Sequence, residues 1–438
     1  MIKRLLLLLM AMLPSALWAA DGDEFNKDNI YYRVLSETAK TCQVYSYLHN
    51  GYYDMVIPEQ VNGYTVVSVR DSAFLKSRNL ASITFPKTIK RIGKYACYDS
   101  YQLYSVTIQG CDTICDYAFC DSHNLTTVNI EDGVKWIGDY AFMVYYYQWR
   151  PYDPYSSPSE YALPNSVEHI GKCAFAHNKQ LVNVVLPRHL SKISERMFDD
   201  CPNLKSVEGI QWENVDSIER NAFGCQYLES EINITNATYV GQDAFSGCNK
   251  ATIRFSEKLK NIGDDAFNGC HGLVSPLHIT KDMTIGNNCF VGCSNVESIN
   301  VDEGVSAYCP TNGCNALIKY GGWISDSTIV LGCAKTTIPS SVKVIGSGAF
   351  AYCKELKTIP YSSSVFLFDD RAFEGCEGLK EVTIPPTVEN LGFGVFENCT
   401  NLEAVYINSP TIFRSLPNSY AERYFKKIGH TIFPIALN

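Results

Sequence analysis

The sequence lacks the motifs by which most enzymes are recognised. It contains no His-Glu-x-x-His, no Gly-x-Ser-x-Gly and no phosphate-binding loop, and its eight histidines are scattered along 438 residues. We therefore expect no enzymatic activity, no catalytic residues and no cofactor. A pair of carboxylates assembled from distant segments would leave no such motif and is the one catalytic arrangement that stays open.

Basic residues are scarce as well. The chain carries 37 Lys and Arg against 46 Asp and Glu, which gives a formal net charge of −9. A protein that binds nucleic acid or an anionic membrane needs a basic patch to meet the phosphates, and this sequence has none. We expect neither kind of partner.

Long apolar runs are absent except at the N-terminus. Residues 1–20 begin with two basic residues, Lys3 and Arg4, and continue with an apolar run that ends in small residues. This order is typical of a secretory signal peptide, and the run is too short to span a bilayer. The first cysteine, Cys42, lies far beyond it, which does not support a lipid-anchored N-terminus. We expect an exported chain, secreted or at the cell surface, with no transmembrane segment.

An internal repeat of about 23 residues dominates the rest of the chain. The hexapeptide Ile-Gly-Asp-Tyr-Ala-Phe at 137–142 returns with small changes at 170–175, 262–267 and 345–350. We call its last residue the anchor. Looser copies have their anchors at Phe74, Cys97, Phe119, Phe198, Phe223, Phe245, Phe290, Phe373 and Phe396. Most successive anchors are 22 or 23 residues apart, so each repeat is one structural unit.

Each unit contains a short alternating segment such as Val382-Thr383-Ile384, followed by Pro385 and, further on, Gly392. Alternation with period two predicts a short strand with one buried face, Pro ends it, and Gly permits a corner. One unit then holds two extended segments and a tight, helical turn around Ala-Phe. Stacked units share one core, so the sequence predicts a mostly β solenoid in the form of a curved rod.

The full unit reads Ile-Gly-x-x-Ala-Phe-x-x-Cys-x-x-Leu-x-x-Val-x-Ile-Pro and spans about residues 64–412. It resembles the unit of the BspA-like leucine-rich repeat proteins, exported surface antigens of bacteria that also occur in some protozoa. The resemblance implies a leucine-rich-repeat solenoid and a role in adhesion or protein interaction.

The remaining segments fit around these repeats. Residues 21–63 lack the repeat but alternate, which predicts an N-terminal β cap, and residues 413–438 are expected to form a C-terminal cap. Insertions interrupt the repeats at 143–161 and at about 302–336. With both ends capped, we expect a monomer.

The insertion at 143–161 is rich in aromatic residues, which supply a large contact area at a low entropy cost. It is a candidate recognition loop, and the alternative is that its rings fold back over the outside of the solenoid. Its candidate binding residues are Tyr145, Tyr146, Tyr147, Trp149, Tyr152 and Tyr155.

The main strands supply a second candidate surface. Residues between the buried ones face outward, and when stacked they form a face of mostly small, uncharged polar groups. Such a face suits a protein or a glycan more than a small molecule, which needs a deep apolar pocket. The candidate residues are Thr84, Thr107, Asn129, Asn183, Asn300, Thr383 and Tyr406.

The 18 cysteines would normally suggest disulfides in an exported chain. Many of them, however, lie three residues after an anchor, at one equivalent core position where a small apolar thiol fits. We expect buried free thiols there, with Cys309 and Cys314 as the exception. Cys111, Cys115, Cys120 and His123 are spaced loosely like metal ligands but fall at different repeat positions, so we expect no metal site.

Two functions follow as hypotheses. The first is a non-catalytic adhesion or interaction protein that binds an extracellular protein. The second is a glycan-binding protein that captures polysaccharide through the loop at 143–161. A purely structural role is the third possibility.

Overall fold

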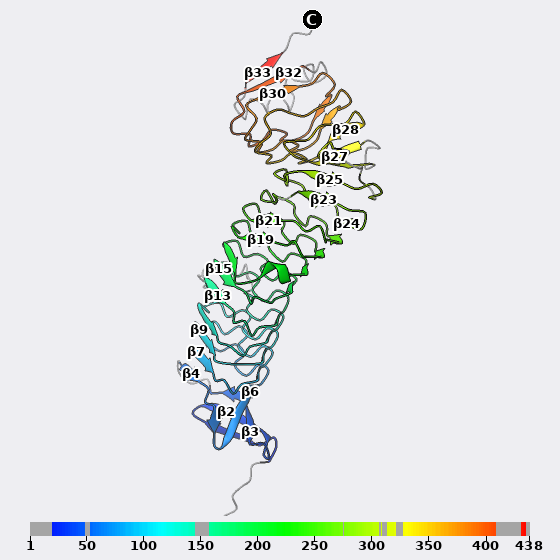
Figure 1. Cartoon of the computed structure of the whole chain (residues 1–438). Coiled ribbons are helices and arrows are strands. Elements are labelled where there is room, and N and C mark those ends of the chain that lie inside the picture. The colour runs from blue at the N-terminus through cyan, green and yellow to red at the C-terminus, as the bar shows by residue number, and fades with distance from the viewer. Residues whose placement is uncertain are drawn as a thin grey trace, which may run out of the picture. The chain divides into compact units, whose positions relative to one another are not determined.

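The computed structural model describes residues 20–48, 53–144, 157–274, 276–305, 308, 313–320, 327–408 and 431–434. The predicted signal peptide, the aromatic part of the first insertion, Cys309 and most of the predicted C-terminal cap lie outside these residues. The chain divides into two compact units, Met1–Asn178 and Lys179–Asn438. Each unit is a leucine-rich-repeat solenoid of short parallel strands, as predicted (Figure 1).

Unit 1 begins with an antiparallel meander of β1 (Glu24–Lys27), β2 (Ile30–Ser36) and β3 (Thr41–Tyr47). Strand β3 then pairs in parallel with β6 (Tyr64–Val69), which β5 (Gln60–Val61) flanks in antiparallel fashion. Alternate residues of β2 and β3 are buried, so the meander extends the apolar interior of the first winding.

Two parallel ladders run through the windings of unit 1. The longer strands are β4 (Tyr53–Val56), β7 (Leu80–Phe85), β9 (Ser105–Ile108) and β11 (Thr127–Ile130). The two-residue strands that continue from β6 are β8 (Arg91–Ile92), β10 (Thr113–Ile114), β12 (Trp136–Ile137) and β14 (His169–Ile170). Strand β13 (Glu160–Ala162) places Tyr161 against the rings of Phe142 and Phe175.

Unit 2 continues the same plan. Its short strands are β16 (Lys192–Ile193), β18 (Ser217–Ile218), β20 (Tyr239–Val240), β22 (Asn261–Ile262) and β24 (Thr284–Ile285). Its main strands pair as β15 (Asn183–Val185) with β17 (Ser206–Glu208), β19 (Glu231–Asn233) with β21 (Thr252–Arg254), and β23 (Leu277–Ile279) with β25 (Ile299–Val301).

The described strands of the second insertion include an antiparallel pair. Strand β26 (Ala316–Lys319) runs antiparallel to β27 (Ser327–Gly332), and β27 resumes the parallel ladder with β28 (Val342–Ile345). The remaining strands are β29 (Leu367–Phe368) and β31 (Asn390–Leu391) in that ladder, and β30 (Glu381–Ile384), β32 (Ala404–Ile407) and β33 (Thr431–Pro434) in the other.

The anchor phenylalanines form the centre of the core. Their rings stack with centroids 5.2 Å apart for Phe119 and Phe142, and 5.3 Å apart for Phe223 and Phe245. The strands of successive windings lie about 4.8 Å apart, so a repeat that returns every winding puts ring upon ring. The fully buried rings of the anchors confirm the predicted core.

The corner around Ala-Phe differs from the prediction, because it is a hydrogen-bonded turn and not a helix. The residue before each Ala has a left-handed backbone, with φ of 56° at Tyr95 and 58° at Tyr117. This conformation points alternate backbone N–H groups at the next winding. The N–H of Cys97, for example, donates to the carbonyl of Ala118 (2.7 Å). A helix would consume those donors locally. Among the described residues the only helical element is the 3₁₀ turn η1 (Trp212–Asn214).

The cysteines three residues after an anchor occupy one buried position, as predicted, and they are also donors. The Sγ of Cys270 donates to the carbonyl of Phe245 (3.0 Å), the anchor of the preceding winding, and Cys376 does the same to Phe350 (3.1 Å). Ser100 takes this position in unit 1 and donates to Phe74 (2.9 Å). The free thiols of this column in unit 2 are Cys201, Cys248, Cys270, Cys293, Cys353, Cys376 and Cys399.

Candidate binding surfaces

The outer face of the long ladder in unit 1 carries a row of small polar side chains. Thr84 pairs with Thr107, and Thr107 pairs with Asn129, in direct register across β7, β9 and β11. None of the three is buried, whereas their neighbours Ile83 and Val106 are. In the next row Ser82 donates a hydrogen bond to Asp54 (2.7 Å). The structure therefore brings these three predicted residues together on one exposed face.

The predicted residues of unit 2 do not form one row. Asn183 accepts a hydrogen bond from Ser206 (2.7 Å) on the neighbouring strand, and Thr383 pairs with Tyr406 between β30 and β32. Asn300 pairs with His278 in the separate ladder of β23 and β25. All four are at least partly exposed.

Charges interrupt this face in unit 2. Arg254 forms an ion pair with Glu231 (2.7 Å) across β19 and β21, and His278 contacts Asp302 (2.9 Å). Exposed pairs of this kind contribute roughly 0–1 kcal/mol, so they orient side chains more than they stabilise the sheet. A face of mostly small, uncharged polar groups was predicted, and the described strands of unit 1 fit this better than those of unit 2.

The aromatic candidates Tyr145, Tyr146, Tyr147, Trp149, Tyr152 and Tyr155 lie outside the described residues. Their role in binding stays a prediction.

A second surface of unit 1 was not predicted. Tyr95, Tyr117 and Tyr140 take the same left-handed position in three successive corners, and their rings stack nearly in parallel at 4.9 and 4.6 Å. Four residues before Tyr140, on β12, Trp136 stacks on His169 of β14 at 3.6 Å. We call these five residues the Tyr–Trp strip. Trp136 is 46% exposed and Tyr95 is 38% exposed, so the strip lies at the surface.

The strip could have been found by aligning the repeats. Tyr stands immediately before Ala in three consecutive units, at 95, 117 and 140, a position that other units fill with Ser, Cys, Arg, Asn, Asp or Gly. A single Tyr in one corner does not predict a stack of rings. Three Tyr at the same position of consecutive units do predict one.

Two cations next to the strip are paired with aspartates. Arg91 binds Asp71 (2.6 Å) and Lys94 binds Asp116 (2.8 Å). Burial alone would raise the pKa of the Asp71 carboxyl, but hydrogen bonds from Arg91 and from the N–H of Lys94 outweigh it and lower that pKa. Asp116 likewise accepts the N–H of Asp139 (3.1 Å) in the next winding. The aspartates thus bind two of the cations at the border of the strip, and a third cation, Lys172, lies over the ring of Tyr140 at 5.7 Å.

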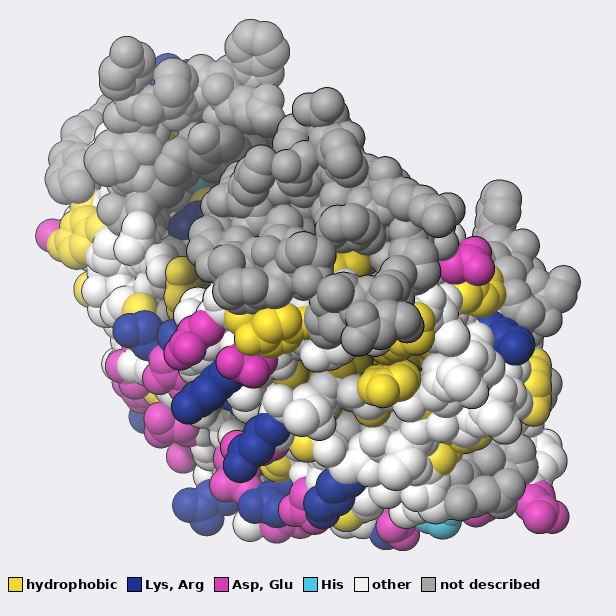
Figure 2. Space-filling view, turned by 90° about the horizontal axis from the view of Figure 1, so that it is seen from above, with side chains coloured by type: hydrophobic (Ala, Val, Ile, Leu, Met, Phe, Trp, Pro, Cys, Tyr) yellow, Lys and Arg dark blue, Asp and Glu magenta, His cyan; other side chains and the backbone are white. Residues whose placement is uncertain are grey.

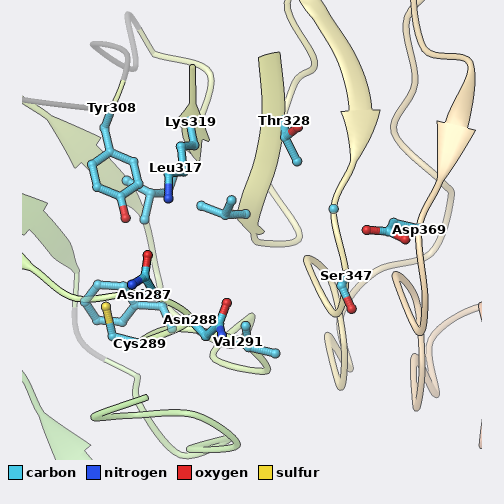
Figure 3. A pocket seen from close by; sticks show the side chains of 13 residues that line it. Asn287, Asn288, Cys289, Val291, Tyr308, Leu317, Lys319, Thr328, Ser347 and Asp369 are labelled. Atoms are coloured by element: carbon cyan, nitrogen blue, oxygen red, sulfur yellow. The ribbon is translucent and has the colours of Figure 1, made fainter. Parts of the chain in front are cut away.

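Unit 2 contains a small cavity beside the second insertion (Figure 3). Its volume is about 150 Å³, and Tyr308 and Lys319 lie on one side of it, with Ser347 and Asp369 on the other. Burial raises the pKa of Cys289, which also lines it, to about 12, so this thiol stays protonated and is not a nucleophile.

The described residues form no metal centre, and their charges are mixed in sign on the face that Figure 2 shows. Within the described ranges, no three His, Cys, Asp or Glu side chains cluster closely enough to hold a metal ion. Figure 2 shows a face on which basic and acidic side chains are interspersed, with no patch of one sign. In the part of the chain that the structure describes, no helix has the length and hydropathy needed to span a membrane.

One solved structure supports the fold, and a second is similar to this chain. A leucine-rich repeat protein from Bacteroides ovatus is 23% identical, and the match covers 94% of this chain and 100% of that one with a TM-score of 0.53. A leucine-rich cell surface protein from Faecalibacterium prausnitzii is 21% identical over 90% of this chain and 97% of that one, with a TM-score of 0.43. At these identities the likeness concerns the fold alone.

The sequence itself matches a family model. Among curated proteins none matches the chain. The model of the BspA type leucine-rich repeat region, however, matches residues 25–146, 155–274, 229–311 and 332–431. These ranges include nearly all of the windings described above, with their anchor rings and corner turns. The chain therefore belongs to the BspA-type leucine-rich repeat family.

Proposed function

We propose that this protein is exported and acts as a non-catalytic adhesion or interaction module that binds an extracellular protein. The observation that carries the proposal is the Tyr–Trp strip of unit 1. Tyr, Trp and Arg dominate the binding energy of protein interfaces, and three Tyr and one Trp gather here beside Arg91. The adjacent polar sheet face offers an extended surface of the kind on which repeat proteins bind their partners.

The geometry of the strip favours a protein over a glycan at this place. A sugar ring binds an aromatic residue by lying on its face. In the strip part of these faces is covered, because Tyr117 stacks between Tyr95 and Tyr140 and His169 covers one face of Trp136. The tyrosine hydroxyl groups suit the polar side chains and backbone of a protein partner.

Export and a place at the cell surface are part of the proposal. They rest on the signal peptide predicted at residues 1–20 and on the family to which the chain belongs. The size of the polypeptide secreted by a bacterial host tests this: a mature N-terminus at Asp21 is expected, and retention of residues 1–20 would contradict it.

Binding is tested with the chain from Asp21 onward on a panel of purified extracellular-matrix proteins, by surface plasmon resonance. Trp136→Ala and Tyr95→Ala are each expected to weaken binding roughly 30-fold, the loss of a hot-spot residue worth about 2 kcal/mol. Tyr361→Ala is the matched control, because Tyr361 is 56% exposed but lies in unit 2. Binding that both strip variants leave unchanged would contradict the proposal.

Glycan capture through residues 143–161 is the second candidate, and the aromatic composition of that loop favours it. Binding to a polysaccharide that is insensitive to salt and disappears with Trp149→Ala supports this candidate. Binding to a matrix protein with no response to glycans supports the first.

A further inference from the structure

Unit 2 carries a trough in the corner surface that none of the functions above uses. Its volume is about 390 Å³, within the range of roughly 300–1,000 Å³ that small-molecule sites occupy. Residues of the windings anchored at Phe223, Phe245, Phe267, Phe290, Phe350 and Phe373 line it. It therefore crosses several windings of one compact unit.

The floor of the trough consists of Gly247, Gly269 and Gly292, which follow one another in consecutive windings two residues after the anchor. Their φ values are 76–78°. Glycine is not needed for that conformation here, because Asp200 and Asn398 take the same position with φ of 53° and 60°. The three missing side chains leave open space above the backbone.

A side chain at the floor would enter that space and would not collide with the fold. A Cβ at Gly247 would meet no atom within 4 Å, and one at Gly269 would meet only the Cα and N of Gly247, at 3.5 and 3.6 Å. The trough is therefore a property of these residues and not of the repeat itself.

An aromatic pair forms the wall. The imidazole of His271 stacks on the ring of Tyr352 at 3.8 Å, and the Tyr352 hydroxyl donates to Glu374 (3.1 Å). Burial, helped by the charge of Lys354, lowers the pKa of His271 to about 4, so the imidazole is neutral at physiological pH. A neutral imidazole offers one donor and one acceptor.

The wall exists because the second insertion lets distant windings meet. Ser294, four residues after the anchor Phe290, donates to the carbonyl of Ala349 (3.2 Å), and Asn295 donates to the carbonyl of Tyr352 (3.1 Å). Tyr352 thus occupies, next to Gly292, the place that another glycine would take in a regular repeat. A polar aromatic side chain closes one end of the glycine floor.

The other polar groups of the trough are uncharged and available. The side-chain amides of Gln226 and Asn249 and the ring nitrogens of His271 have no hydrogen-bond partner among the described residues. Asn268 uses its amide nitrogen on Asp265 (3.0 Å), which leaves its oxygen free to accept. The only charged residues in the lining, Arg371 and Glu374, lie 3.8 Å apart as a pair.

We propose that this trough binds a saccharide, one sugar ring or two, through the amides of Gln226 and Asn249 and the imidazole of His271. Amide and neutral imidazole groups both donate and accept, as the hydroxyls of a sugar do. The paired charges give no net attraction for a phosphate or a carboxylate, and the polar lining gives none for a lipid. The site is independent of the Tyr–Trp strip and of residues 143–161.

The test is isothermal titration of the full chain with glucose, galactose, mannose, xylose and N-acetylglucosamine and with their oligosaccharides. At least one of them is expected to bind with a Kd near or below about 1 mM. Gly269→Asn places a side chain in the trough with a backbone conformation that Asn398 already adopts, and it is expected to weaken binding at least tenfold. His271→Phe keeps a ring against Tyr352, loses the hydrogen bonds, and is expected to weaken binding similarly.

Gly63→Asn is the matched control. Gly63 has a φ of 83°, nothing lies within 4 Å of its Cβ position, and it belongs to unit 1. Unchanged affinity in this variant shows that the loss in Gly269→Asn comes from the trough. If no saccharide of the panel binds, or if Gly269→Asn and His271→Phe both bind as the parent does, the proposal is wrong. Because none of these variants touches the strip, their outcome leaves the protein-binding test separate.

Discussion

Substitutions at Cys270 can decide why the repeat places a thiol three residues after its anchor. Cys270 is fully buried, and its Sγ donates to the carbonyl of Phe245 at 3.0 Å. That carbonyl also accepts the backbone N–H of Cys248 (3.0 Å), so the thiol satisfies its second lone pair. If the position needs only a small apolar group, Ala should serve there and Ser should not. If it needs a donor, the order is reversed.

The structure favours the donor. Ser100 and Ser122 occupy the equivalent position in unit 1, are fully buried, and donate to the preceding anchor carbonyls at 2.9 Å. Cys270→Ser keeps the hydrogen bond and is expected to cost less than about 1 kcal/mol of unfolding free energy. Cys270→Ala loses the bond, roughly 0.5–1.5 kcal/mol, and leaves a cavity the size of one heavy atom, roughly 1 kcal/mol more.

The measurement is the midpoint and slope of urea unfolding for the parent and both variants. The slope matters because an array of windings need not unfold in one step, and only equal slopes allow midpoints to be compared as free energies. The expected order of stability is parent, then Cys270→Ser, then Cys270→Ala. Greater stability of the Ala variant than of the Ser variant would refute the role of the hydrogen bond.

Three further predictions follow from the same core and from the trough. Phe245→Ala removes a ring stacked at 5.3 and 5.6 Å on its neighbours and is expected to cost roughly 3–5 kcal/mol in urea unfolding; a loss below about 1 kcal/mol would contradict a continuous ring stack. Burial raises the pKa of Cys248 from 9.0 to about 12, so stability is expected to be full below pH 9 and to fall between pH 9 and 12, which circular dichroism detects; constant stability over that window would contradict thiol burial. Saccharide binding is expected to be constant from pH 5 to 8 and to weaken below about pH 4, where His271 gains a proton and loses its acceptor; titration calorimetry at each pH checks this, and a fall centred near pH 6.5 would contradict a neutral His271.

The parts of the structure that repeat in the sequence were predictable. The spacing of the anchors gives the stacked rings, and the alternation in each unit separates buried Ile83 from outward Thr84. Such patterns are local to one unit and recur, so the evidence for them accumulates along the chain.

The parts that depend on contacts between windings were not. The corner turn was expected to be helical, but its hydrogen bonds go to the next winding. The sequence of a single unit does not reveal those bonds. The trough requires Ser294 and Ala349 to meet across the second insertion, which no spacing of anchors predicts. The Tyr–Trp strip was predictable in part. The sequence shows that its tyrosines share one repeat position, but only the structure shows that their rings stack.

The corner turns have a consequence for how such a chain can change in length. In most corners of the described residues the N–H of the anchor residue donates to a carbonyl of the following winding, as from Phe119 to Ala141 and from Phe245 to Ala266. The hydrogen bonds between two successive regular windings therefore always run in the same direction and join the same kinds of backbone groups. Loss or duplication of a whole unit brings together windings whose backbone donors and acceptors match. Loss of half a unit brings together groups that do not match. Genetic gain and loss in this chain should therefore proceed in whole multiples of one unit.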